Sequence, residues 1–121
     1  MDQSEIGTRG EAAAAAYLER VGMQVVDRNW RNGRGEIDIV ALDGEELVIC
    51  EVKTRTTDSR GTPEDAVSPA KQRQLARLAQ AYAASAGIGE TCNIRFDVVT
   101  VRVLAADRAL LRHHRAAFVV G

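Results

Sequence analysis

The feature that most constrains the fold is a pair of strand-like segments, residues 35–42 and 47–53, separated by an Asp43-Gly44 turn signal. Both segments are largely apolar, and the second is rich in β-branched side chains. A turn dipeptide between two such segments predicts an antiparallel hairpin. An Asn32-Gly33 turn signal before the first segment predicts a further strand, at about residues 23–30. We therefore expect three consecutive strands in a meander.

Two amphipathic segments flank this meander. From about residue 4 to residue 21, apolar side chains recur at helical spacing, and Gly22 follows as a helix stop. Ser68 as N-cap and Pro69 at the first helical position begin a second helix, which we expect to end near residue 85. Residues 54–67 between strand and helix are polar, with little periodicity, and predict a mobile loop, of a length that is often functional.

Two extended segments follow the second helix. Residues 94–104 alternate as a fourth strand, and residues 107–120 predict a final strand through Leu110 and Leu111 with a short end at 116–120. The order helix, three strands, helix, one or two strands predicts an α/β fold, a mixed sheet of four or five strands flanked by two α-helices. At 121 residues the chain is expected to form a single domain, residues 1–121.

Composition limits the classes of function. A net charge of −1 argues against a protein that coats nucleic acid through bulk positive charge, and 4% aromatic residues argue against a stacking platform. The first residues lack the features of a signal peptide, and no segment has the length of a membrane helix. We expect a soluble, cytoplasmic protein. Cys50 and Cys92 lack metal-ligand spacing, which indicates buried or idle thiols.

Polar side chains are expected on one face of the predicted hairpin. Alternate residues of a strand share a face, so Asp38 points away from Ile37 and Ile39, and Glu51 points the same way as Lys53. The loop between the strands decides whether the two polar faces coincide. With two loop residues Asp38 is a diagonal neighbour of Glu51, and with four it is directly opposite. Three loop residues would separate them unless a bulge compensates.

Two carboxylates that converge on paired strands form an oxygen-rich site suited to Mg²⁺ or Mn²⁺. Lys53 beside Asp38 and Glu51 can orient or deprotonate a water and offset charge that builds on a phosphorus centre. The alternative is a solvated salt bridge at the end of an edge strand, which is the commoner meaning of a bare Glu-x-Lys. The facing Asp38 favours a metal-dependent site that cleaves phosphodiesters.

Each helix offers one further candidate. Glu11 falls at the margin of the apolar stripe of the first helix, where its carboxylate can reach the sheet. The alternative is a capping box with Thr8. Lys71 lies on the packed side of the second helix near its N-terminus, where a phosphate is also favoured. A lysine whose stem lies on the core while its ammonium reaches water is the alternative.

Basic residues gather in the middle of the chain, and four are candidates for contacting nucleic-acid phosphates: Arg31, Arg34, Arg55 and Lys71. Solvated surface charge is the alternative explanation. His113 and His114 are adjacent and therefore point apart on a strand, which predicts a surface role rather than a metal site. The lone Trp30 is expected to pack in or beside the core.

Taken together, these motifs resemble the YraN family of small bacterial proteins. The resemblance spans almost the whole chain and rests on Arg9-Gly10-Glu11, Asn29-Trp30-Arg31, Gly35-Glu36-Ile37-Asp38, Glu51-Val52-Lys53-Thr54-Arg55, Lys71 and Arg95-Phe96-Asp97-Val98-Val99. The Asp38…Glu51-x-Lys53 pattern is in turn similar to the PD-(D/E)XK nuclease superfamily, which has the restriction-endonuclease-like fold. A first helix that carries Glu11 is similar to that of archaeal Holliday junction resolvases.

The resemblance implies divalent-metal hydrolysis of a phosphodiester. Asp38 and Glu51 would bind Mg²⁺ or Mn²⁺ together with the Val52 carbonyl, Lys53 would position the water, and Glu11 would hold a second metal or its water. The expected function is a structure-selective endonuclease acting on branched DNA in recombination or repair, with a homodimer suited to a symmetric junction. One alternative is a non-catalytic module that binds nucleic acid or a protein partner. Another is a phosphohydrolase for small nucleotides, for which no base pocket is recognisable.

Overall fold

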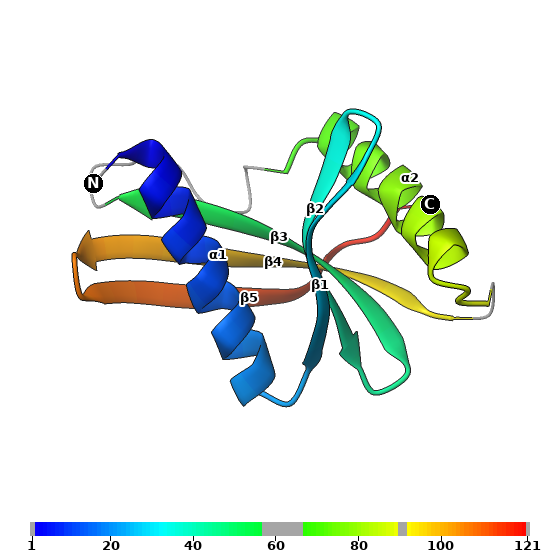
Figure 1. Ribbon diagram of the computed structural model, residues 1–121, viewed down its shortest axis with the longest axis horizontal. Coiled ribbons are helices and arrows are strands. Elements are labelled where there is room, and N and C mark those ends of the chain that lie inside the picture. The colour runs from blue at the N-terminus through cyan, green and yellow to red at the C-terminus, as the bar shows by residue number, and fades with distance from the viewer. Residues whose placement is uncertain (1, 57–66, 90–91, 121) are drawn as a thin grey trace.

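A mixed five-stranded sheet is the centre of the structure, a computed structural model that describes residues 2–56, 67–89 and 92–120 (Figure 1). The elements in chain order are α1 (Gln3–Arg20), β1 (Gln24–Asn32), β2 (Gly35–Asp43), β3 (Glu46–Thr56), α2 (Pro69–Ser85), β4 (Ile94–Ala105) and β5 (Arg108–Phe118). Neighbouring strands in the sheet are also neighbours in the chain, and only the β3–β4 pair is parallel. The expected α/β fold with a mixed sheet and two helices is confirmed.

The helices begin at capping residues. Asp2 caps α1 by accepting a 2.8 Å hydrogen bond from the Glu5 N–H, so the helix starts too early for Thr8 to be its cap. The capping-box explanation of Glu11 is therefore wrong. Ser68 caps α2 as expected and accepts a 3.1 Å bond from the Lys71 N–H. Of the loop expected at 54–67, residues 54–56 instead continue β3, and 57–66 lie outside the described residues.

The β2–β3 hairpin has the register in which Asp38 faces Glu51. Leu42 pairs with Leu47 and Asp43 with Glu46, around a turn in which Gly44 has a φ of 62°. The turn itself is Gly44-Glu45, because the strands extend to Asp43 and Glu46, one pair further than expected; the register is the one expected for four residues between 42 and 47. The last strand differs from expectation, because β5 is one continuous strand paired with β4 and not a core segment with a separate short end.

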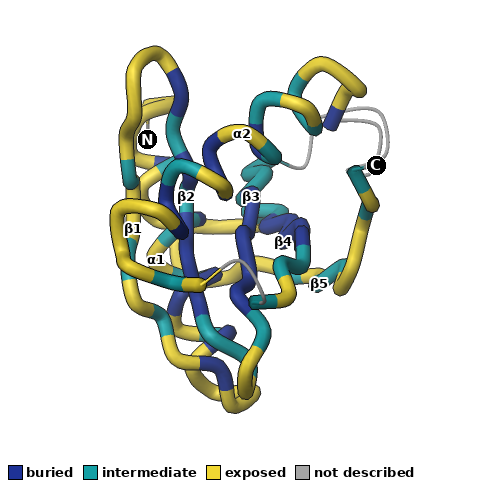
Figure 2. Tube along the Cα trace, turned by 90° about the vertical axis from the view of Figure 1, so that its right-hand side faces the viewer, coloured by how far each residue is buried: buried dark blue, intermediate teal, exposed yellow. Residues whose placement is uncertain are grey.

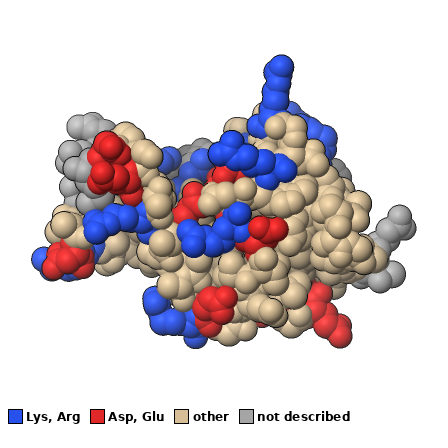
Figure 3. Space-filling view, in the orientation of Figure 1, with Lys and Arg blue, Asp and Glu red and all other residues tan. Residues whose placement is uncertain are grey.

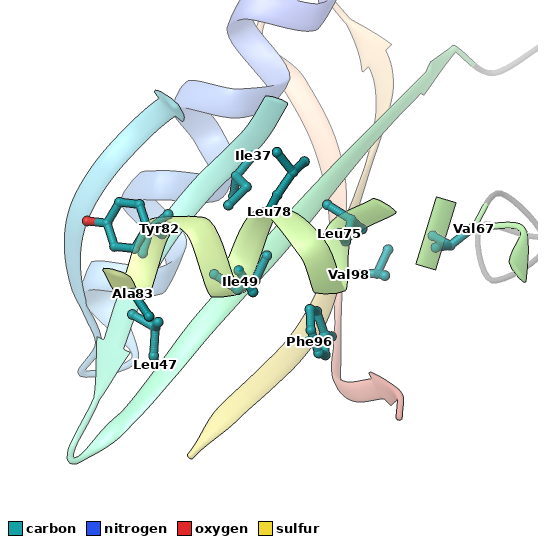
Figure 4. Close-up of a cluster of buried hydrophobic side chains, with 12 residues drawn as sticks. Ile37, Leu47, Ile49, Val67, Leu75, Leu78, Tyr82, Ala83, Phe96 and Val98 are labelled. Atoms are coloured by element: carbon teal, nitrogen blue, oxygen red, sulfur yellow. The ribbon is translucent and has the colours of Figure 1, made fainter. Parts of the chain in front are cut away.

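Each helix covers one face of the sheet. Under α2 lies a buried cluster shared with β2, β3 and β4 (Figure 4): Ile37, Val40, Leu47, Ile49, Leu75, Leu78, Tyr82, Phe96 and Val98. Under α1 lies a second cluster: Ala14, Leu18, Ile39, Ala41, Val48, Cys50, Val99 and Val101. The inner strands are buried on both faces, whereas β1 and β5 at the two edges are largely exposed (Figure 2).

The sheet forks between β2 and β3. Their pairing runs from the turn only as far as Ile39 and Cys50. Beyond that point the first part of β2 pairs only with β1, out to Gly35, while β3 continues beside β4 to Thr56. The two arms diverge in Figure 1, with the N-terminal part of α1 beside the β3–β4 arm and α2 beside the β1–β2 arm. Asp38 and Glu51 are the first residues beyond the last pair.

Candidate functional site at the fork of the sheet

A hollow of about 270 Å³ lies at the fork of the sheet. Its lining includes Glu11 from α1, Asp38 from β2, and Glu51, Val52 and Lys53 from β3. Residues from three elements, separated by up to 42 positions in sequence, thus meet at one place. Figure 3 shows acidic and basic side chains mixed where the surface dips between the two arms. Every residue predicted from the sequence to bind metal or act in catalysis lines this hollow.

Asp38 bridges the two arms at their point of separation. Its Oδ2 accepts a 2.8 Å hydrogen bond from the Val52 N–H. Where β2 leaves β3, this backbone donor has no carbonyl of β2 to bind, and the carboxylate satisfies it instead. The fork therefore fixes the position of Asp38 without any help from a metal ion.

Strict alternation along β2 fails at this point. Ile37 and Ile39, which we expected on one face, lie in the separate clusters beneath α2 and α1. The break coincides with Asp38, across from Asn29, whose φ of 54° is in the left-handed region that asparagine tolerates. The expectation from strand parity was therefore wrong for Ile37. The left-handed Asn29 on β1, and the separation of β2 from β3 at this point, turn the backbone of β2.

Glu51 is a buried acid with a strongly perturbed pKa. Only 7% of the residue is exposed. Burial, followed by a hydrogen bond to the Asp38 carboxyl group and the charge of Asp38, raises the pKa of Glu51 to about 8, against the opposing charges of Lys71 and Lys53. Lys71 Nζ lies 3.6 Å from Glu51 Oε2. Burial beside Asp38 therefore favours the protonated form of Glu51, in opposition to the two lysines.

Glu11 reaches the hollow because α1 lies unusually close to the end of β3. A Cβ built on Gly10 would overlap the side chain of Thr54, so only glycine permits this approach. Glu11 Oε1 is buried without a hydrogen-bond partner among the described residues. Burial, then the charges of Asp38 and Glu36, raise the pKa of Glu11. An unsatisfied carboxyl oxygen beside two other acids is a position that favours a cation or a water.

Lys53 lies on the same strand as Glu51, two residues further on, and is half-buried in the wall of the hollow. Its positive charge acts on Glu51, but it forms no ion pair within 4 Å in the part of the chain that the structure describes. The second amine near the acids is that of Lys71, which approaches from α2 and is already paired with Glu51. The two lysines thus differ in that only Lys71 serves as a counter-ion.

The four residues predicted to contact phosphates lie around the hollow, but not in one row. Arg31 forms a 3.6 Å ion pair with Glu36 and its side chain is 77% exposed. Arg55 lines the hollow and donates to the Thr54 carbonyl at 3.2 Å. Arg34 is on the turn between β1 and β2, over a separate hollow against α2. Lys71 forms an ion pair with Glu51, so neither a phosphate contact nor an ammonium group that simply reaches water describes it fully.

The donor set suits a hard divalent cation held mainly by two ligands. No group of three His, Cys, Asp or Glu side chains among residues 2–56, 67–89 and 92–120 is close enough to form a metal cage. Glu11 therefore stands apart from the Asp38–Glu51 pair while it lines the same hollow. Mg²⁺ keeps several waters and is commonly bound through one or two carboxylates together with substrate phosphates. The oxygen donors present fit that pattern.

A buried ionic network that sequence reasoning missed lies on β4. Arg95 Nε and Nη2 donate to both oxygens of Asp97, at 2.9 and 3.0 Å, and the fully buried Asp97 also accepts from the Ala116 N–H. His113 Nε2 lies 2.7 Å from the same carboxylate and Nδ1 3.4 Å from the Tyr17 hydroxyl. The surface role expected of His113 is wrong, since its side chain is 5% exposed.

The spacing Arg-x-Asp was a usable signal for this network, because residues two apart share a strand face. The partners from other elements were not visible in the sequence. Trp30 packs edge-on against Tyr82, with ring centroids 5.2 Å apart, as expected of a lone tryptophan. Cys50 is a buried free thiol, as predicted, and Cys92 is a half-buried one. No helix in the described residues is both long and apolar enough to cross a membrane.

Comparisons with known proteins bear on the family. A solved structure titled "The structure of Pyrococcus Furiosus SfsA in complex with Ca2+" aligns over 89% of this chain and 63% of its own, with 11% identity and a TM-score of 0.44, a likeness too weak to bear on fold or function. A UPF0102 protein of Geobacter sulfurreducens is 47% identical over 113 residues, covering 93% of this chain and 88% of that one.

A UPF0102 protein of an Arthrobacter species is 50% identical over 110 residues, covering 91% and 92% of the two chains. The family model described as "Uncharacterised protein family UPF0102" matches residues 10–101, a span that holds Glu11, Asp38, Glu51 and Lys53. These matches confirm the resemblance to the YraN family seen in the motifs. The chain belongs to the protein family UPF0102.

Proposed function

We propose that this protein is a divalent-metal-dependent endonuclease that hydrolyses phosphodiester bonds in branched or otherwise structured DNA. One observation carries the proposal: two carboxyl groups, Asp38 and Glu51, share a hydrogen bond at the fork of the sheet, in the hollow that Lys53 also lines. Burying an acid until its pKa reaches about 8 costs folding free energy, and such perturbation is typical of functional sites. A structural salt bridge would not require a second acid at this position.

Mg²⁺ or Mn²⁺ would be held by Asp38 and Glu51, with the Val52 carbonyl as the further ligand that the superfamily resemblance suggests. Glu11, with its unsatisfied Oε1, would hold a second ion or the water of the first. When bound, such an ion lowers the pKa of water and offsets negative charge on the phosphate. The raised pKa of Glu51 fits this role, because a cation supplies the positive charge that the ionised acid pair lacks.

The other side chains that line the hollow would have separate roles in the reaction. Lys53 directs an ammonium group into the site, where it orients the attacking water and donates to a phosphoryl oxygen. Glu11 Oε1 is an acceptor for a hydrogen of a water at the α1 wall. Hydrolysis replaces one P–O ester bond with a bond to the water oxygen, and the released sugar oxygen takes up a proton. Lys71 balances the charge of Glu51 before substrate arrives.

Cleavage assays on a panel of DNA structures test this proposal. Duplex, flap, fork and four-way junction DNA are incubated with Mg²⁺ or Mn²⁺ and wild-type protein, Lys53→Ala or Asp38→Asn. We expect wild type to cut at least one branched substrate, and each variant to lose at least 100-fold in rate while it still binds DNA. Glu45→Gln, a change at an exposed turn acid, is the matched control and should cut normally. Equal cutting by all four proteins would indicate a contaminating nuclease.

A second function is supported by a specific observation. Lys71 and the Asp38–Glu51 hydrogen bond already satisfy Glu51 without a cation, as expected of a binding module whose acids only stabilise the fold. Calorimetric titration with Mn²⁺ distinguishes the two, because a metal site loses its heat of binding in Glu51→Gln. Metal-independent DNA binding without cleavage of any substrate on the panel would favour the non-catalytic module.

A further inference from the structure

A second hollow, of about 320 Å³, lies between α2 and the tip of the β1–β2 hairpin. Its polar lining comprises the guanidinium groups of Arg34 and Arg77 and the amides of Asn32 and Gln74. None of its described lining residues is acidic. Two guanidinium groups and two amides form a donor-rich wall, which suits an oxyanion and not a cation or an apolar ligand.

The walls of this hollow are fixed by backbone geometry. Gly33, with a φ of 60°, allows the tight turn that carries Arg34. Gly35 follows, and a Cβ added there would lie 2.8 Å from Leu78 Cδ1. The hairpin therefore lies directly against α2, and the hollow is lined by Arg34 from the hairpin and Arg77 from the helix. The spacing between them is set by packing and not by contacts between their own side chains.

The positive charge in this hollow is not neutralised by the protein. Arg31, Lys71 and Arg95 each have a carboxylate partner within 4 Å. Arg34 and Arg77 are exposed and have none within that distance among the described residues. Figure 3 shows basic side chains gathered over α2 and the hairpin, in a protein whose net charge is −1. Two arginines that line one hollow without a carboxylate partner among the described residues indicate an anion that comes from outside the chain.

Two separate elements connect this hollow with the fork. On α2, Lys71, Gln74 and Arg77 are spaced by three residues on one side of the helix, so Arg77 lies about 9 Å along the axis from Lys71. On β2, Gly35 lies about 10 Å from Asp38. Lys71 and Asp38 both contact the candidate site through Glu51. The anion site is thus about 10 Å from the acids, a separation that a few nucleotides of one strand can span.

We propose that the hollow lined by Arg34 and Arg77 binds a backbone phosphate of the nucleic-acid substrate, a few nucleotides from the phosphate that is cut. The distance to the cut rests on the proposed function; the phosphate site itself rests on the hollow. The guanidinium groups bind the phosphate oxygens, and Asn32 and Gln74 add amide donors. Because the protein contacts only phosphate oxygens of the nucleic acid and no base, this contact positions the strand without reading its sequence.

Binding measured in EDTA tests the site apart from catalysis. A fluorescently labelled four-way junction is titrated with full-length wild type, Arg34→Ala, Arg77→Ala and the double variant, at several salt concentrations. We expect each single variant to weaken binding about 5- to 20-fold and to reduce the slope of log K against log salt by about 0.9, the value for one lost phosphate contact. Arg77→Lys should recover only part of the loss, because an ammonium cannot bind two oxygens at once.

Arg20→Ala is the matched control, since it removes the same charge from an exposed position in the last turn of α1, outside this hollow. An equal loss in Arg20→Ala, unchanged binding in the double variant, or no DNA binding by wild type would each overturn the proposal. A second experiment uses substrates trimmed to one or four phosphates beyond the cut. Wild type should lose affinity on trimming, whereas the double variant should not.

The outcomes separate this inference from the function on which part of it rests. If wild type never cuts DNA but its binding depends on Arg34 and Arg77, the nuclease proposal fails and the phosphate site stands. If wild type cuts, and the double variant cuts with the same KM, the phosphate site is wrong and the nuclease proposal stands.

Discussion

Asp38 Oδ2 accepts a 2.8 Å hydrogen bond from the Val52 N–H, at the point where β2 and β3 separate. The Asp38 carboxylate thereby accepts a backbone N–H of β3 just beyond the last β2–β3 pair, and the same side chain lines the hollow at the fork. Stability and the metal binding that we propose would therefore depend on different properties of this side chain. The first needs an acceptor at Oδ2, and the second needs the negative charge.

Two substitutions at residue 38 should separate these properties. Asp38→Asn retains a carbonyl oxygen for the Val52 N–H, so we expect nearly wild-type stability with loss of the heat of Mn²⁺ binding. Asp38→Ala leaves a partly buried donor without a partner and should cost about 1–3 kcal/mol. Urea unfolding and calorimetry measure the two effects. If both variants were equally unstable, the hydrogen bond would not be the reason that Asp38 is needed.

Metal-free stability should depend on pH through Glu51. The pKa is about 8 in the folded protein and near 4.5 in the unfolded chain, so the folded state binds the proton more tightly. The stabilisation is complete below pH 4.5 and is lost as pH rises through about 8, with a slope of at most about 1.4 kcal/mol per pH unit.

Thermal melts from pH 5 to 9 check this expectation. Glu51→Gln should flatten the decline, because an amide cannot ionise. In wild type, Mn²⁺ should stabilise the protein more at pH 8 than at pH 6, since the bound carboxyl group must be deprotonated. A wild-type melting temperature that rises between pH 6 and 8 without metal would contradict the assigned cause.

Gly10 should control the position of Glu11. A Cβ at residue 10 overlaps Thr54, so Gly10→Ala should push α1 away from β3, with a loss of about 1–3 kcal/mol and of cleavage. Thr54→Ala in the same chain removes the overlapping atoms and should restore part of both. Gly7→Ala is the control on the same helix: nothing lies within 4 Å of its added Cβ, and the change should be neutral or stabilising by up to about 1 kcal/mol.

Asp97 should contribute to stability independently of the candidate site. Burial opposes its charge, but hydrogen bonds from Arg95, the Ala116 N–H and His113 hold the pKa of Asp97 below its usual value. Its contribution is therefore present above about pH 4 and lost as pH falls through the lowered pKa. Asp97→Asn should cost about 1–3 kcal/mol at pH 7, because hydrogen bonds to a buried charge are weakened, while Arg95 Nη1 keeps its partners Asp43 and Glu46 at 2.9 and 3.0 Å.

Urea unfolding at pH 7 and pH 3 measures this difference. The gap between wild type and Asp97→Asn should narrow at pH 3, and Asp107→Asn, at an exposed position, should match wild type at both. A gap that is unchanged between the two pH values would mean that packing, and not the charge of Asp97, carries the effect.

The order of the elements could be predicted from the sequence because its causes are local. Ser68 and Pro69 mark the start of a helix wherever they occur before an amphipathic segment, and Asp43-Gly44 needs only its own backbone to form a turn. The sequence predicted β3 only as far as Lys53. Residues 54–56 are polar, and they become part of the strand because they pair with β4. The acids and the lysine were recognisable as a set from their residue types on two neighbouring strands, whereas the strand period alone left their relative placement open.

The sequence by itself thus determined the two helices, the order of helices and strands along the chain, and the choice of Asp38, Glu51 and Lys53 as candidates. Only the tertiary structure decided that β2 and β3 separate just beyond Ile39 and Cys50, that Lys71 pairs with Glu51, and that Arg34 and Arg77 line one hollow. These relationships join elements that are distant in sequence, and they depend on the close approaches that Gly10 and Gly35 allow. Local patterns hold no information on such distances, because packing between helices and sheet sets them.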